Sequence, residues 1–161
     1  MKASPITFRE LKFLKVQVET NPRAKKRAGE FDFDGSSVGW LHEHGRPKNG
    51  GSWWVLMGFL TGQDDQEDPE ITCPYVIDVQ AVGLFEIDED VPEENRERIV
   101  YENGAALVYG ALREMVSTIT ARSMYGLLML PTPSFLGSYQ EMMAKRAVET
   151  ANAPAPDEPT N

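Results

Sequence analysis

The sequence is poor in the side chains on which most catalytic and metal sites depend. Its 161 residues include one cysteine, Cys73, and two histidines, His42 and His44. A single cysteine excludes an internal disulfide and a cysteine-based zinc site, and it fits a reducing cytoplasm. Because these two histidines lie only two positions apart, every other part of the chain lacks the commonest general base.

The sequence also lacks a long apolar run and an excess of positive charge. The longest apolar stretch, Trp53 to Leu60, is too short to span a bilayer, and Arg9, Glu10 and Lys12 interrupt the region where a signal peptide would be apolar. The 16 basic and 25 acidic residues give a net charge of -9. This charge repels phosphate backbones and anionic lipids, so we expect a cytoplasmic protein that binds neither nucleic acid nor membrane.

Length and composition fit one globular domain. Apolar residues make up 41% of the chain and charged residues 25%, which is ordinary for a folded domain of 161 residues. Beyond Val148 the sequence turns to Ala, Pro, Asp, Glu and Asn. We therefore expect a single domain over residues 1–149 and a disordered tail over residues 150–161.

The first half of the chain has the pattern of β-strands. Apolar and polar residues alternate from Leu14 to Glu19, and a second extended segment, with a break at 35–37, is expected between Phe31 and Trp40. Trp53–Leu60 is apolar on both faces, as in a central strand. From Tyr75 to Ile87 the apolar residues share one face, whereas Asp78 lies on the other. Four consecutive strands predict an antiparallel meander.

The second half has helical periodicity. Pro92 and the acids around it favour a helix start, and a kink is expected at Asn103–Gly104. A long helix is predicted from Ala105 to Ala121, and Ser134 can cap a last, shorter helix. The fold class is therefore α+β, a four-stranded antiparallel sheet followed by a long and a short helix. One side of the long helix is strongly apolar: Val108, Leu112, Met115, Val116 and Ile119.

The few candidate catalytic residues have simpler interpretations. His42 and His44 would project to the same side of a strand, but a metal site needs a third ligand. Cys73 has no neighbouring base or cation that would make it a nucleophile. The acids near Asp64 and Asp88 lie in charge-rich segments where carboxylates keep ordinary pKa values. We expect no enzyme activity, no metal and no cofactor.

Aromatic and methionine side chains exceed what a small core needs. Such side chains can repack around different apolar partners, so as a set they favour a docking groove for polypeptide. For any one of them alone, a place in the core or in a subunit contact is the better explanation. The set comprises Trp40, Trp53, Trp54, Tyr125, Leu127, Leu128, Met129, Leu130, Phe135, Tyr139, Met142 and Met143.

A family resemblance enters at the long helix. Residues 112–122, Leu-Arg-Glu-Met-Val-Ser-Thr-Ile-Thr-Ala-Arg, are followed by Leu128-Met129-Leu130-Pro131 and Ser134-Phe135. This pattern, together with Asp78-Val79-Gln80 and Gly83-Leu84-Phe85, resembles the SecB-type protein-export chaperones. The resemblance implies the same order of strands and helices, assembled as a homotetramer, a dimer of dimers, with the long helices between the sheets.

The resemblance also implies a function and its residues. SecB-type chaperones hold unfolded precursor polypeptides without ATP and deliver them to the SecA motor. The motor-binding acids would be Glu19 and Asp78, and the apolar side of the long helix would be the oligomer interface. The client-binding groove would lie near Phe31, Phe33, Trp40, Tyr125, Leu128, Phe135 and Tyr139.

The sequence departs from the family pattern where the motor would bind. Lys15 stands where a further acid is usual, and the tail from Ala147 contains no Lys or Arg, although the family's tail is basic in part. An alternative is therefore a SecB-like chaperone dedicated to one partner, such as an antitoxin, without motor binding. A third hypothesis is a metal protein or enzyme built on His42 and His44.

Overall fold

Four strands form one antiparallel sheet in the structure, a computed structural model that describes residues 4–64 and 66–152. The strand order is β1-β4-β3-β2, so β3 and β4 are central, and the doubly apolar stretch from Trp53 lies in a central strand as predicted. The strands are β1 (Ile6–Thr20), β2 (Val38–Gly45), β3 (Trp53–Thr61) and β4 (Tyr75–Ile87).

The predicted meander is correct for three strands and wrong for the first. β2, β3 and β4 follow one another as antiparallel neighbours, but β1 pairs with β4 along a ladder from Ile6↔Ile87 to Thr20↔Tyr75. The chain then crosses to the far edge through residues 21–37, as in a Greek key. Alternation indicates the face on which each residue lies, but it does not indicate which strand is the neighbour. In the structure β1 pairs with β4, the other long strand of the sheet.

β1 is longer and less regular than its alternation predicts. It begins at Ile6 rather than Leu14, and its register shifts between Phe8 and Glu10 and between Phe13 and Lys15. The second shift places Leu14 in a β-bulge, where its side chain is 59% exposed. Leu14 is therefore not on the buried face that the sequence assigned to it.

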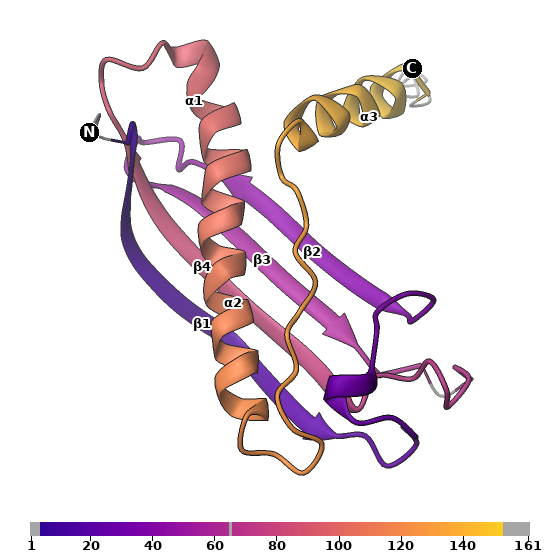
Figure 1. Ribbon diagram of the computed structural model, residues 1–161. Helices are drawn as coiled ribbons and strands as arrows, with labels where there is room; N and C mark the ends of the chain where they lie inside the picture. The colour runs from indigo at the N-terminus through magenta and orange to yellow at the C-terminus, as the bar shows by residue number, and fades with distance from the viewer. Residues whose placement is uncertain (1–3, 65, 153–161) are drawn as a thin grey trace, which may run out of the picture.

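The helical half lies across one face of the sheet (Figure 1). α1 (Glu93–Ile99) begins directly after Pro92, as predicted, and α2 spans Ala105–Thr120. Between them a π turn over Val100–Gly104 replaces the expected kink, so the helix continues. Gly104 is needed there because a Cβ would lie 2.8 Å from Val55 Cγ2 of β3.

The core fills the space between the sheet and α2. Buried side chains of β3 and β4, among them Met57, Phe59 and Val79, face Val108, Leu112 and Val116 of α2. These three helical residues were predicted to contact another subunit, but each is 0% exposed within the protomer. They cannot contact another subunit, because the sheet of the same protomer already covers this side of the helix. Met115 and Ile119 are half-buried.

The last helix starts later than predicted. After turns over residues 121–125, residues 126–135 run back along α2 without regular secondary structure towards α3, which spans Ser138–Asn152 (Figure 1). Ser134 does not cap this helix, because Gly137, with a φ of 82°, turns the chain immediately before it. The first three residues of the predicted tail belong to α3, and the rest of the tail lies outside the described residues. Within the described ranges, no helix has the length and apolar character needed to cross a membrane.

Candidate functional site

A chain of aromatic contacts begins in the crossover between β1 and β2. Phe31 and Phe33 meet edge to face with ring centroids 4.9 Å apart, and Phe33 meets Phe59 of β3 at 5.9 Å. Phe59 in turn meets Trp40 of β2 at 5.0 Å. The crossover, which the sequence placed in an extended segment, is therefore attached to the sheet by aromatic packing rather than by strand pairing.

The same chain of rings continues from Trp40 to the last helix. Trp40 lies 5.2 Å from Tyr109 of α2, and Tyr109 lies 6.0 Å from Phe135 of the linker. His42 is 6.0 Å from Phe135 and stacks on Tyr101 at 4.0 Å, and Tyr101 is 5.7 Å from Tyr139 of α3. We call this series the aromatic strip: Phe31, Phe33, Phe59, Trp40, Tyr109, Phe135, His42, Tyr101 and Tyr139.

The aromatic strip combines a rigid base with open rings. Phe59, Tyr101 and Tyr109 are buried in or beside the core. Trp40 is 43% exposed, and Phe135 and Tyr139 are half-buried. An apolar chain lying along the strip would therefore meet partly exposed rings that are held in place by contacts with buried rings.

The structure brings together most of the residues predicted to line a groove. Phe31, Phe33, Trp40, Phe135 and Tyr139 all belong to the aromatic strip. The remaining two lie elsewhere. Tyr125 packs edge to face on Tyr75 at 5.9 Å, and Leu128 is buried in the core.

Sequence reasoning missed the rings that form the base of the aromatic strip. His42 could have been found, since it lies two residues from Trp40 in β2 and so shares its face. Tyr101 gives no such signal because it lies in the π turn, where the helical period is broken. Phe59 and Tyr109 join the strip through contacts between distant segments, which no local pattern reports.

The linker between α2 and α3 contributes Phe135 to the aromatic strip and is held by hydrogen bonds to its main chain. Thr120 Oγ1 accepts a hydrogen bond from the Leu128 amide at 3.0 Å. Arg113 Nε donates to the Leu130 carbonyl at 3.0 Å, and Tyr109 OH donates to the Pro131 carbonyl at 2.8 Å. Leu128 and Leu130 point inward while Leu127 and Met129 are exposed, so the linker alternates like a strand.

Both histidines are packed against Tyr101, and His44 also has a side-chain hydrogen-bond partner. Both project to the same side of β2, as the strand pattern predicted, opposite Met57 and Val55 of β3 and towards Tyr101 of the π turn. Burial, helped by the neighbouring His44, lowers the pKa of His42 to about 4. His44 Nε2 lies 2.9 Å from Glu97 Oε1. Across residues 4–64 and 66–152 no three potential ligands gather as a metal site would require.

Glu97 of α1 joins three segments of the fold. Besides His44 of β2, it accepts a hydrogen bond from Tyr139 OH of α3 at 3.1 Å, and Arg146 of α3 lies 3.9 Å away. Burial opposes ionisation of Glu97, but the hydrogen bonds from His44 and Tyr139 outweigh it and hold its pKa below the ordinary value. Through its hydrogen bond with Tyr139, the ionised Glu97 carboxylate therefore holds α3 beside the aromatic strip.

Cys73 has the environment of a structural residue. Its side chain is buried, and this burial raises the pKa of the thiol to about 12. Because the thiolate is the nucleophilic form of cysteine, the thiol is inert near neutral pH.

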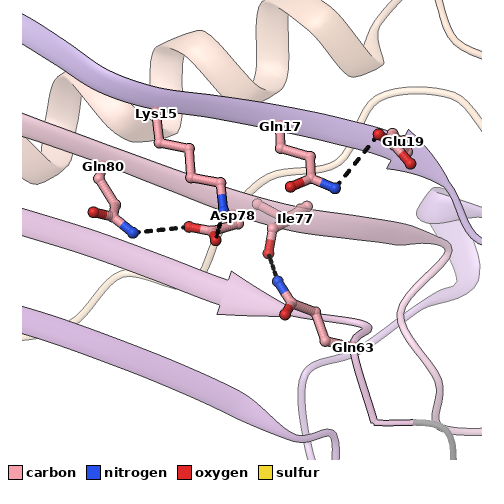
Figure 2. A network of polar contacts seen from close by, with 7 residues as sticks. All are labelled: Lys15, Gln17, Glu19, Gln63, Ile77, Asp78 and Gln80. Carbon is pink, nitrogen blue, oxygen red and sulfur yellow. Dashed lines mark hydrogen bonds and ion pairs between the residues drawn. The ribbon is translucent and has the colours of Figure 1, made fainter.

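The sheet face opposite α2, here called the open face, carries the acids predicted to meet a motor protein. Asp78 forms an ion pair with Lys15 of β1 and accepts a hydrogen bond from Gln80 at 3.1 Å (Figure 2). Its side chain is only 8% exposed. Glu19 accepts a hydrogen bond from Gln17 at 3.4 Å and remains exposed.

No family model and no curated protein matches this sequence. Among solved structures, it is similar to the Mycobacterium tuberculosis SecB-like chaperone Rv1957 in complex with a ChAD peptide from the Rv1956 HigA1 antitoxin. The match covers 81% of this chain and 91% of that chain, with a TM-score of 0.53 and 18% sequence identity. The fold is SecB-like. The predicted α+β architecture is thereby confirmed, and at this identity the similarity establishes the fold alone.

Proposed function

We propose that this protein is a chaperone that holds unfolded polypeptide along the aromatic strip without nucleotide or cofactor. The observation that carries the proposal is the unbroken series of ring contacts from Phe31 to Tyr139, with exposed rings on a buried base. Burying one large apolar side chain contributes about 1.5 to 3 kcal/mol. Micromolar binding, at about -8 kcal/mol, therefore needs several anchors in a row.

The working form in this proposal is a cytoplasmic homotetramer, a dimer of dimers. Its support is an apolar cavity of about 340 Å³ between β1 and the outer side of α2, lined by Leu11, Phe13, Ala111, Glu114, Met115 and Thr118. Leu107, on the same helix, is 44% exposed. Leu107 and the side chains that line this cavity would contact a second copy of the chain, in place of the buried Val108, Leu112 and Val116.

Suppression of client aggregation tests the chaperone function. Trp40→Ala removes an exposed ring from the aromatic strip, so the concentration that halves aggregation of a denatured client should rise by about tenfold. Trp54→Ala is the matched control, because it removes the same side chain from the opposite face of the sheet. If the wild-type protein leaves aggregation unchanged at a fourfold excess, it does not hold unfolded chains in general, and only a version dedicated to one partner remains.

The proposal has two versions, which differ in the clients that the chaperone binds and in whether it delivers them to SecA. In the export version, the protein delivers clients to SecA through Glu19 and Asp78. The pairing of Asp78 with Lys15 leaves Glu19 as the more available of these two acids, which favours the second version, a chaperone dedicated to one partner such as an antitoxin. The relative found among solved structures, bound to an antitoxin peptide, supports the same version.

Two binding measurements separate these versions. A general export chaperone should bind both SecA and a reduced, alkylated protein that cannot fold, whereas a dedicated chaperone should bind neither. Lys15→Ala tests the role of the ion pair, since freeing Asp78 should strengthen any SecA binding, and the effect should shrink as salt is added. SecA binding that is unchanged by Lys15→Ala would rule out Asp78 as part of the contact.

A further inference from the structure

A cavity lies between α3 and the buried Tyr101, at the α3 end of the aromatic strip. Its volume is about 320 Å³, which falls at the lower end of the range for pockets that bind small organic groups. One wall comes from the π turn and the rest from α3. It is lined by Tyr101, Ser138, Glu141, Met142, Lys145 and Arg146.

The Tyr101 side of the cavity is fixed in advance. The Tyr101 ring stacks on His42 with an interplanar angle of 28° and meets the edge of His44 at 4.9 Å. Two neighbouring β2 side chains therefore hold this ring in place before any ligand binds. A flat apolar group entering the cavity would meet a preorganised aromatic surface, which lowers the entropic cost of binding.

The α3 side of the cavity is adaptable. Met142 lines it with a flexible thioether that can fit differently shaped apolar groups. Most of α3 is exposed, including Met143 at 45%. The helix is tied to the rest of the chain by hydrogen bonds at its start, from Tyr139 to Glu97 and from the Gly137 amide to Glu102 Oε1 at 2.9 Å. Small shifts of α3 could therefore adjust the width of the cavity.

The charge at the rim indicates what should lie beside the bound group. Arg146 lies 3.9 Å from Glu97, so the charges at the rim that form no ion pair among residues 4–64 and 66–152 are the positive one of Lys145 and the negative one of Glu141. Within the part of the chain that the structure describes, Lys145 has no ion-pair or hydrogen-bond partner. An exposed lysine that forms no ion pair favours a carboxylate on the incoming ligand.

We propose that this cavity is an anchor subsite that takes one aromatic side chain of the bound polypeptide, with an acidic residue next to it. The proposal rests on the proposed chaperone function, and it adds a sequence preference that the aromatic strip alone does not provide. In this arrangement the client's ring stacks against Tyr101 beneath Met142, and the neighbouring carboxylate meets Lys145.

Short labelled peptides and two matched variants test the subsite. The probes are extended 12-residue peptides that share an apolar sequence and differ at two central positions, which read Trp-Asp, Ala-Asp or Trp-Lys. The wild-type protein should bind the Trp-Asp peptide about tenfold more tightly than either of the others. Met142→Trp fills the cavity and should reduce the preference for Trp-Asp over Ala-Asp to less than about twofold. Met143→Trp, one position along α3 and outside the cavity, should retain it.

A charge reversal tests the second half of the proposal. Lys145→Glu should invert the preference between the Trp-Asp and Trp-Lys peptides, and the inversion should weaken at high salt. If Met142→Trp and Met143→Trp bind all the peptides like wild type while remaining folded by circular dichroism, the subsite does not exist. That result would leave the chaperone function intact, whereas failure of the wild-type protein to bind any unfolded chain would remove both.

Discussion

His44 Nε2 and Glu97 Oε1 lie 2.9 Å apart, although one residue is in β2 and the other, 53 residues later, is in α1. The same carboxylate accepts the hydroxyl hydrogen bond of Tyr139 from α3. Since α3 has few other attachments, one ionised side chain couples the C-terminal helix to the edge of the sheet. The first prediction concerns this connection.

Glu97→Ala should loosen α3 without unfolding the sheet. Losing hydrogen bonds to a charged, partly buried group costs about 1 to 3 kcal/mol, which corresponds to amide exchange in α3 that is faster by about fivefold or more. Exchange in β3 and β4 should stay at the wild-type rate. Hydrogen exchange read by mass spectrometry measures both, and Glu94→Ala, exposed on the same helix, is the control. Equal exchange in the two variants would mean that α3 is held in another way.

The low pKa of His42 predicts weaker stability in mild acid. The unfolded chain takes up a proton on this histidine near pH 6.5, whereas the folded protein resists doing so until about pH 4. The contribution is therefore complete above pH 6.5 and is lost as the pH falls towards 4.

His42→Phe isolates this effect, because it keeps a ring against Tyr101 and removes the titration. Between pH 7 and pH 4.5 the wild-type protein should lose about 1 to 2 kcal/mol more unfolding free energy than the variant, allowing for partial exposure of the imidazole. Urea unfolding at the two pH values gives the comparison. A variant with the same pH dependence as wild type would place the sensitivity in another group.

Two glycines in the helical half should respond to the same substitution in opposite ways. A Cβ on Gly104 would lie 2.8 Å from Val55 Cγ2, so Gly104→Ala should destabilise the fold by about 1 to 3 kcal/mol through overpacking. Gly110 in α2 has open space around its Cα, and Gly110→Ala should stabilise the protomer by about 0.5 to 1 kcal/mol. Thermal unfolding of the two variants checks the sign of each change.

Substitutions on the two sides of α2 should have different effects, one on the stability of the protomer and the other on the mass of the oligomer. Leu112 is buried in the protomer, so Leu112→Ala should lower the unfolding free energy by about 2 to 5 kcal/mol. Leu107 is exposed on the outer side, so Leu107→Asp should leave the protomer folded but reduce the oligomer mass seen by light scattering. An oligomer unaffected by Leu107→Asp would mean that copies associate through another surface.

Local sequence patterns predicted the elements well. Alternation from Tyr75 to Ile87 gave β4 and its two faces, and Pro92 together with the helical period of residues 105–121 gave the start of α1 and the extent of α2. These features depend on neighbouring residues of the chain, so they can be read one segment at a time. Local errors arose where a backbone irregularity interrupts the period, as at the Leu14 bulge and the π turn.

The sequence by itself determined that this is an α+β chain, acidic and rich in aromatic side chains, because composition and period are local properties. Only the tertiary structure decided that β1 pairs with β4, that Leu112 belongs to the core rather than to a subunit contact, and that Phe31 and Tyr139 lie at the two ends of one series of rings. Such contacts join residues far apart in the chain. Their energies depend on which surfaces meet after folding, and no segment carries that information alone.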